Sequence, residues 1–195
     1  YNTDELWITT NFDVSASTKI VKMDLGGGLY TVSQVSAWRE DSYPQTLGFA
    51  DANTVLIGSR WDNGWISTDG GDHWDLFQPS TGKPGYGLAL DPWDSTQNTF
   101  YIADEQFGVQ KTSDQGANWT PANLGLHAMS PDYLEVDPQN PGRLYAKIAE
   151  NGWPGIFTSA DGGQNWVFSS LEAASEGKRP VISMVAYNNG RVFAG

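Results

Sequence analysis

The chain has 195 residues, contains no cysteine and carries a formal net charge of −12 at pH 7. The lack of cysteine excludes disulfide bonds, thiolate metal sites and a cysteine nucleophile, and the negative charge opposes binding to nucleic acid or to an anionic membrane. Its 22 glycines, 10 prolines and 9 tryptophans favour strands and turns over long helices. No apolar run approaches the roughly 20 residues of a membrane helix, so we expect no membrane insertion.

The first predicted strand, ELWITT, opens a segment at residues 5–24 in which we expect a strand, a degenerate turn and a second strand. No signal peptide is visible before it, so we expect either a leader that has been removed or a piece of a longer polypeptide. Residues 20–45 fit none of the repeats described below. We interpret them as an insert.

Three similar units follow at residues 46–80, 86–124 and 132–170. Each unit contains four short apolar segments, which we interpret as four strands. Turn-forming segments such as DPWDSTQN and DPQNPG separate the first strand from the second. A fixed period in the forties is typical of repeated units such as the four-stranded blades of a propeller.

Each unit carries the pattern Ser/Thr-x-Asp-x-Gly-x-x-Trp between its third and fourth strands: STDGGDHW, TSDQGANW and SADGGQNW. The Asp and Ser/Thr side chains can bond backbone groups within a turn, Gly permits positive φ, and Trp buries a large apolar face. We therefore interpret these octapeptides as structural hairpins. Their defining residues are Ser67, Asp69, Gly71, Trp74, Thr112, Asp114, Gly116, Trp119, Ser159, Asp161, Gly163 and Trp166.

The C-terminal segment, residues 181–195, contains two further predicted strands around an Asn-Asn-Gly turn. Together with 5–24 it would complete a fourth blade, which would close a ring and remove exposed sheet edges. The alternative is that the missing blades come from a second copy or from a larger parent chain.

The three octapeptides resemble the Asp-box, or BNR repeat, of bacterial-type sialidases, xyloglucan-cleaving glycoside hydrolases, sortilin-type receptors and photosystem II assembly-factor propellers. The resemblance covers nearly the whole chain except residues 20–45. It implies an all-β fold with one β-propeller domain over residues 1–195 and about four blades. It leaves the activity open, because the family includes both enzymes and binding proteins.

In such a blade, the loops between the second and third strands lie opposite the octapeptides, where rigid scaffolds usually carry their functional residues. Here these loops pair acids with aromatics, a combination that suits sugar rings. The alternative is that the acids are solvated and the aromatics pack between blades. The candidate ligand-binding residues of this end of the domain are Trp61, Trp65, Glu105, Phe107, Glu150, Trp153, Tyr86 and Tyr133.

Two carboxylates are candidate catalytic residues, because a facing pair could act as general acid and base on a glycosidic bond. By resemblance, xyloglucanase-type enzymes carry a catalytic Asp just after a second strand, and Asp104 in FYIAD is the position of best match. Asp62 is the second candidate.

We expect a secreted, extracellular or periplasmic propeller that binds a polysaccharide or another neutral polar ligand. The alternatives are a glycoside hydrolase acting on β-glucan-type polysaccharide, or a protein-interaction scaffold of the sortilin or assembly-factor type. We expect no cofactor, no metal ion and no nucleic-acid partner.

Overall fold

The three-dimensional structure is a computed structural model of the chain. It describes residues 5–10, 19–24, 30–34, 44–51, 53–59, 64–77, 84–104, 106–126, 130–148, 155–169, 184–187 and 191–194. These residues form seventeen β-strands in five sheets and no helix. The predicted all-β class is confirmed.

Three four-stranded antiparallel sheets share one order, in which each strand pairs with the next along the chain. Blade 1 contains β4 (Pro44–Phe49), β5 (Val55–Ser59), β6 (Gly64–Ser67) and β7 (Asp75–Phe77). Blade 2 contains β8 (Pro84–Leu90), β9 (Phe100–Asp104), β10 (Gly108–Thr112) and β11 (Thr120–Pro121). Blade 3 contains β12 (Pro131–Val136), β13 (Leu144–Ile148), β14 (Gly155–Ser159) and β15 (Val167–Ser169). Each blade corresponds to one predicted unit, and the outer limits of those units stay predictions.

The terminal strands differ from the expected shared fourth blade. The N-terminal strands β1 (Glu5–Thr10), β2 (Lys19–Asp24) and β3 (Tyr30–Gln34) form one sheet, and β16 (Met184–Tyr187) pairs with β17 (Arg191–Ala194) in another. In addition, β2 pairs along its length with β3, a strand from the segment predicted to be an insert. The N-terminal hairpin therefore has a third strand of its own.

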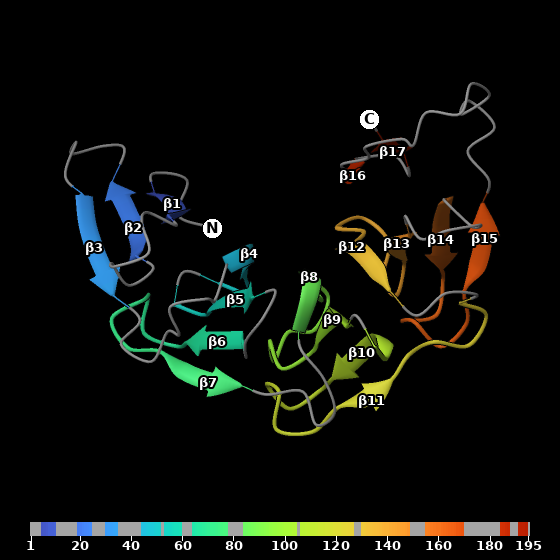
Figure 1. Cartoon of the computed structure of the whole chain (residues 1–195), viewed down its shortest axis with the longest axis horizontal. Helices are drawn as coiled ribbons and strands as arrows, with labels where there is room; N and C mark the ends of the chain where they lie inside the picture. Colours follow the sequence, from blue (N-terminus) through green and yellow to red (C-terminus); the bar gives the residue numbers. More distant parts are fainter. Residues whose placement is uncertain are drawn as a thin grey trace.

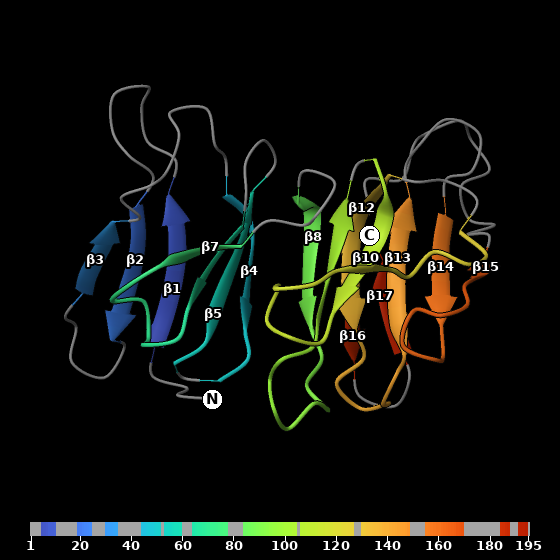
Figure 2. The same cartoon turned by 90° about the horizontal axis from the view of Figure 1, so that it is seen from below.

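The five sheets follow one another along an open arc, with the N-terminal sheet at one end and the C-terminal sheet at the other (Figure 1). Strands β4, β8 and β12 lie on the inner side of this arc, and β7, β11 and β15 lie on its outer side. Turning the molecule shows the sheets standing side by side, face against face (Figure 2). Central blades are thus covered on both faces.

Burial on both faces explains the near-continuous apolar runs in the second strands. All five residues of β5 and of β9 are buried, as expected for strands that lie between two covering layers. The outer strands are shorter and more exposed, as in β7, where two of three residues are exposed. The apolar pattern of a strand in this chain therefore depends on whether the strand lies inside its blade or at the outer edge of the arc.

An aromatic cluster joins blade 1 to blade 2. Phe77 lies edge-on to Phe100, with ring centroids 5.6 Å apart, and stacks on Trp119 at 6.0 Å. Phe100 and Trp119 also meet edge-on at 5.4 Å. Offset-stacked and edge-to-face pairs of this kind add about 0.5–1.5 kcal/mol each beyond area burial. The Trp of the second octapeptide is therefore part of the contact between neighbouring blades.

A second core joins blade 2 to blade 3. Tyr101 and Ala103 of β9 lie in one buried cluster with Leu134 of β12 and Trp166 of the third octapeptide. The innermost strands also approach closely, because a Cβ atom added to Gly87 of β8 would lie 2.8 Å from the backbone nitrogen of Leu134. Glycine at this position allows β8 and β12 to come together.

Candidate functional site

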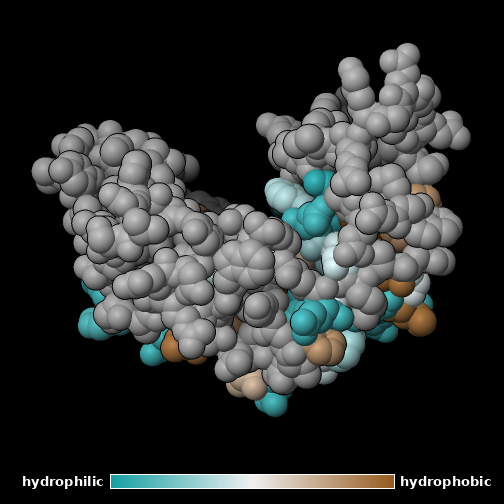
Figure 3. Space-filling view, viewed as in Figure 1, coloured by the Kyte–Doolittle hydropathy of each residue, from teal (hydrophilic) through white to brown (hydrophobic). Residues whose placement is uncertain are grey.

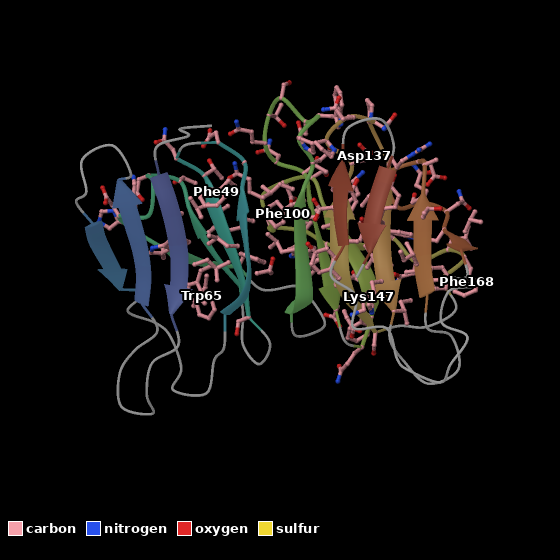
Figure 4. The ribbon with its side chains drawn as sticks, turned by 90° about the horizontal axis from the view of Figure 1, so that it is seen from above. Phe49, Trp65, Phe100, Asp137, Lys147 and Phe168 are labelled. Carbon is pink, nitrogen blue, oxygen red and sulfur yellow. The ribbon has the colours of Figure 1, made fainter. Side chains whose placement is uncertain are left out.

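The two ends of the sheets are chemically different. Each octapeptide is hydrogen-bonded to the turn between the first two strands of its own blade: Gly70 N to Asn53 O (2.8 Å), Gln115 N to Asn98 O (3.0 Å) and Gly162 N to Gly142 O (2.7 Å). We call this end the turn end. The strand ends that flank the β5–β6, β9–β10 and β13–β14 connections lie at the opposite end, which we call the loop end. Figure 4 shows Asp137 at the turn end and Lys147 and Trp65 toward the loop end.

At the turn end, the first octapeptide residue organises its own hairpin. Ser67 Oγ donates to Asp69 Oδ1 (2.9 Å) and accepts the N–H of Gly71 (2.8 Å). Thr112 likewise donates to Asp114 (2.8 Å) and accepts the N–H of Gly116 (2.9 Å), and Ser159 donates to Asp161 (2.8 Å) and accepts the N–H of Gly163 (2.9 Å).

The octapeptide carboxylates are likewise engaged within their own turns. Asp114 accepts the backbone N–H of Asn118 on Oδ1 (2.8 Å) and its side-chain amide on Oδ2 (2.6 Å), and Asp161 accepts the same two bonds from Asn165. The side-chain amides of Asn118 and Asn165, followed by the backbone bonds, lower the pKa of these two carboxyls. This geometry supports the structural interpretation of the octapeptides.

The tryptophan N–H has two kinds of acceptor among the three copies. Trp74 Nε1 and Trp119 Nε1 donate to carbonyls in their own turns, at Gly71 (3.1 Å) and Gly116 (3.0 Å). Trp166 Nε1 instead donates to Ala122 O in the preceding blade, at 2.7 Å. The third octapeptide therefore ties blade 3 to blade 2 with a buried hydrogen bond.

The first octapeptide contains a titratable pair that the others lack. His73 Nδ1 lies 2.6 Å from Asp69 Oδ2. The backbone N–H and then the ring of His73 lower the pKa of Asp69 to about 2, and the hydrogen bond to Asp69 raises the pKa of His73 above 6.5. The His73 contribution to folding is therefore complete below pH 6.5 and lost as pH rises through the higher folded value. The Asp69 contribution is present above pH 3.8 and lost as pH falls through about 2.

We expect the replacement His73→Asn to remove the part of the stability loss above pH 6.5 that belongs to this pair, because Asn118 and Asn165 make the equivalent bonds without titrating. The measurement is the free energy of urea unfolding of both proteins from pH 5 to 9, with the His73 ring followed by NMR. Parallel stability curves for the two proteins would contradict the prediction.

The second octapeptide contains a strained residue. Gln115 has φ 57°, where the equivalent residues are Gly70 and Gly162 with φ 74° and 71°. A left-handed conformation costs an L-residue about 1–2 kcal/mol. Glycine would relieve this strain, but its greater freedom in the unfolded chain offsets part of the stabilisation. We expect Gln115→Gly to stabilise the protein by about 0.5–1 kcal/mol in urea unfolding. Gln139→Gly, at an exposed turn residue without positive φ, is the control and should not stabilise.

At the loop end, part of the predicted site lies outside the described residues. This holds for Trp61, Asp62, Glu105, Glu150 and Trp153 and for the side chain of Tyr86, which belongs to β8. The structure describes the other four candidates, namely Trp65, Phe107, Tyr133 and Asp104.

Asp104 is fully buried at the end of β9. Its Oδ1 accepts the backbone N–H groups of Gln106 (2.7 Å) and Phe107 (2.9 Å), so the carboxylate holds the start of the β9–β10 connection. This is the geometry of an Asx turn. In this structure Oδ1 of Asp104 is engaged with backbone N–H groups. A catalytic role for Asp104 stays a prediction.

The three described aromatics differ in exposure. Trp65 is 0% exposed and belongs to a core cluster with Ile57, against which Leu47 and Trp74 pack, so it has no surface to offer a ligand in this structure. Phe107 and Tyr133 are partly exposed. Burial raises the pKa of Tyr133, whose hydroxyl donates to Glu135 Oε2 at 3.4 Å.

Polar residues that the sequence did not single out support the β9–β10 connection. Asn123 Nδ2 and Gln110 Nε2 both donate to the carbonyl of Phe107, at 2.5 and 3.0 Å, and Asn123 Oδ1 accepts the N–H of Val109 at 2.6 Å. In blade 3, the sequence also did not single out Lys147 and Asp132, whose charged groups lie 3.8 Å apart. Neither the residues around Phe107 nor this ion pair has a characteristic spacing in the sequence, so the sequence offered no signal for them.

The turn end also has a pocket of about 340 Å³ between the ends of β4, β8 and β12. Leu47, Leu88 and Val136 supply apolar walls, and Asp91 and Asp94 lie on its lining. The Asp94 carboxylate already accepts bonds from the backbone and hydroxyl of Thr96 and from the N–H of Thr99, and the Thr96 hydroxyl leads the interactions that hold its pKa well below the usual range. This carboxylate therefore stabilises the turn between β8 and β9.

Two kinds of feature are absent from the described part of the chain. It contains no group of three or more His, Cys, Asp or Glu side chains that could hold a metal ion. It also lacks any helix that is long and apolar enough to cross a membrane.

The solved structures most informative about this chain are β-propellers. The GH74 xyloglucanase from Xanthomonas campestris has a TM-score of 0.59 and 13% identity, over 94% of this chain and 33% of that one. The GH74 enzyme from Niastella koreensis has a TM-score of 0.55 and 17% identity, over 86% and 36%. YCF48 bound to D1 peptide has a TM-score of 0.52 and 17% identity, over 65% and 40%. No protein-family model matches the chain, and no curated protein matches it in sequence.

These similarities establish the fold as that of a β-propeller. The chain spans between 33% and 40% of the length of these three proteins, so their activities and partners are not thereby those of this chain. The likeness to the Asp-box is a matter of the octapeptide pattern and stays a resemblance.

Proposed function

We propose that this propeller binds a polysaccharide, or another neutral polar ligand, at its loop end. The observation that carries the proposal is that three connections at this end, residues 59–65, 103–109 and 149–155, each contain acidic and aromatic residues. The strand order is the same in all three blades, which supports a common location for the three connections. At the turn end, by contrast, the octapeptide carboxylates are occupied by their own hairpins.

The chemistry of these residues suits a sugar. An aromatic face covers the apolar C–H side of a pyranose, and carboxylates accept hydrogen bonds from its hydroxyl groups. The net charge of −12 is compatible with a neutral glycan and opposes a polyanion. The bonds that hold Phe107 in place support a preformed rather than a loosely organised site.

The test is affinity electrophoresis on a panel of soluble β-glucans with three tryptophan variants. Trp61→Ala and Trp153→Ala remove candidate stacking platforms at the loop end. Each should weaken binding by about 10-fold or more, taking the about 1–3 kcal/mol of a base stacked on an aromatic side chain as the scale. Trp93→Ala, at the turn end and 46% exposed, is the matched control and should bind normally. Retained binding in both loop-end variants would reject the proposal.

A glycoside hydrolase is the second candidate, favoured by the similarity to two GH74 enzymes. In this alternative Asp104 or Asp62 is a catalytic carboxylate that acts on a β-glucan-type polysaccharide. Reducing-end release from β-glucan that Asp104→Asn abolishes, at unchanged melting temperature, would favour hydrolysis. Binding without any release in the native protein would exclude it.

A protein-interaction scaffold is the third candidate, favoured by the similarity to a propeller bound to a peptide. The same loop end would then bind an extended segment of a partner protein. Absence of glycan binding together with a protein that co-purifies stoichiometrically, and is lost in Trp153→Ala, would support this alternative.

Localisation and assembly are part of the proposal. We propose an extracellular or periplasmic protein whose ring is completed by a second copy or by a larger parent chain. Cell fractionation checks the first part. The mass of the native particle checks the second, because self-closure predicts 21.3 kDa and a shared ring predicts at least double.

A further inference from the structure

The pocket of about 340 Å³ at the turn end lies between the ends of the inner strands β4, β8 and β12. Each of these strands belongs to a different blade, so three blades meet at one hollow. The inner strands line the concave side of the arc, which is open and has hydrophilic surface along its wall (Figure 3). Small-molecule sites usually have volumes of roughly 300–1,000 Å³. The pocket is therefore large enough for a small ligand.

The apolar walls of the pocket are held by the protein core. Leu88 is 6% exposed and belongs to the cluster that joins blade 1 to blade 2. Val136 is 7% exposed and belongs to the cluster that joins blade 2 to blade 3. Leu47 packs against a third cluster, formed by Ile57 and Trp65. Because close-packed side chains keep their places, the pocket does not depend on a ligand for its shape.

The ionisable groups of the pocket are all acidic. Its lining contains Asp91, Asp94 and Glu135, and the described residues that form it include no lysine, arginine or histidine. The Thr96 hydroxyl leads the interactions that hold the pKa of Asp94 well below its usual range, so this carboxylate stays charged. The net charge of −12 of the whole chain adds to the negative potential. The pocket therefore attracts a cation and repels an anion.

The three carboxylates differ in what their oxygens already bind. Both oxygens of Asp94 accept hydrogen bonds from its own turn, and Glu135 Oε2 accepts the hydroxyl of Tyr133. Asp91 Oδ1 accepts the N–H of Trp93 at 3.0 Å, and no group in the described part of the chain donates to its Oδ2. Asp91 directly follows β8 and is partly exposed. It is therefore the carboxylate of the lining that can accept a further hydrogen bond.

We infer that this pocket binds a small organic cation with an aliphatic body, namely a primary alkylammonium. The ammonium group donates to Asp91 beside the charge of Asp94, and the aliphatic chain lies against Leu88 and Val136. An ammonium has three donors and no acceptor, which matches a lining whose ionisable groups are all carboxylates. An inorganic cation would leave the apolar walls uncovered, and a neutral hydrocarbon would bring no donor for Asp91. The described residues of three blades suffice to form this site, whatever closes the ring.

The probe is hexylammonium, and its controls are hexanol and hexanoate, which have six carbons but no charge or a negative charge. Binding is followed by methyl signals of the isotopically labelled full chain in NMR. We expect hexylammonium to shift the signals of Leu88, Leu90 and Val136 saturably. Hexanol should bind about 10-fold more weakly, because a hydrogen bond to a charged group is worth about that factor, and hexanoate should not bind.

Three variants of the protein test the position of the site. Asp91→Asn removes the charge and keeps an oxygen for the N–H of Trp93, so it should weaken hexylammonium binding about 10-fold and leave hexanol binding unchanged. Asp75→Asn is the matched control, because Asp75 is an exposed carboxylate of β7 outside the lining and its replacement changes the net charge equally. It should change binding by less than about 2-fold. Ala50→Leu places a larger side chain on the lining and should weaken both ligands.

The assignment would be overturned if hexylammonium did not bind saturably, or if hexanol or hexanoate bound as tightly. Equal losses in Asp91→Asn and Asp75→Asn would also overturn it, because the attraction would then belong to the net charge of the chain. If Asp91→Asn lowers the melting temperature, Ala50→Leu decides: unchanged binding in that variant rejects the pocket. None of these outcomes depends on glycan binding at the loop end, which involves other residues and other ligands.

Discussion

Replacing Phe100 by alanine is expected to lower the free energy of unfolding by about 3–5 kcal/mol, the usual cost of truncating a fully buried phenylalanine. Phe100 is 0% exposed and meets Phe77 of blade 1 and Trp119 of its own blade edge-on. The truncation leaves a cavity where two blades meet, and both remaining rings lose a partner. Urea unfolding followed by tryptophan fluorescence gives the value.

Leu124→Ala is the control for this prediction, because Leu124 is a large apolar residue that is 70% exposed. Its truncation should change the free energy of unfolding by less than about 0.5 kcal/mol, as surface substitutions usually do. Similar losses in the two variants would mean that the aromatic cluster does not hold blades 1 and 2 together.

Replacing Gly125 by alanine should destabilise the protein by about 2–5 kcal/mol, combining left-handed strain with overpacking. Gly125 has φ 90°. An added Cβ atom would overlap the carbonyl oxygen of Trp166 and lie 3.2 Å from its backbone nitrogen. Because these are backbone atoms, blade 3 would have to move away from blade 2, which would strain the Trp166 N to Leu124 O bond of 2.8 Å.

Gly142→Ala separates the two causes. Gly142 also has a positive φ, of 73°, but the nearest atom to an added Cβ lies 3.4 Å away. Its replacement should therefore cost only the conformational strain, about 1–2 kcal/mol. Equal losses at Gly125 and Gly142 would show that the close approach of the two blades contributes nothing to stability.

The parts of this fold that the sequence predicts well are those with local causes. The octapeptides are built from bonds between residues two to four positions apart, such as Ser67 to Asp69 and Gly71, so their residue types alone indicate a hairpin. The four-strand units follow from the apolar runs between these turns. Both rest on interactions within about ten residues of the chain.

The parts that the sequence does not predict depend on contacts between distant segments. Trp119 and Trp166 occupy the same place in octapeptides of one pattern, yet Trp119 donates its N–H within its own turn and Trp166 donates to the preceding blade. The acidic loop before Trp65 favours a contact with a ligand, but pairing with Ile57 brings Trp65 into the core. The N-terminal sheet depends on the pairing of β2 with β3, and no octapeptide in the sequence indicates that pairing.

The candidate site is less predictable than the fold for the same reason. Asp104 follows an apolar strand, which is equally typical of a catalytic carboxylate and of a turn residue. The role as a turn residue becomes visible only in the structure, where Asp104 accepts the N–H groups of Gln106 and Phe107. Asn123, which donates to the carbonyl of Phe107, lies sixteen positions further along the chain, so no local pattern indicates this bond.

The proposed function requires ligands to bind at the end of the sheets opposite the octapeptides. The most direct measurement is a titration of the isotopically labelled chain with a cello-oligosaccharide, followed by backbone and indole N–H signals in NMR. We predict that shifts concentrate around Phe107, Val109 and Asn123, while the N–H signals of Asn118 and Asn165 stay in place. Shifts that concentrate on Asn118 and Asn165 instead would contradict the account.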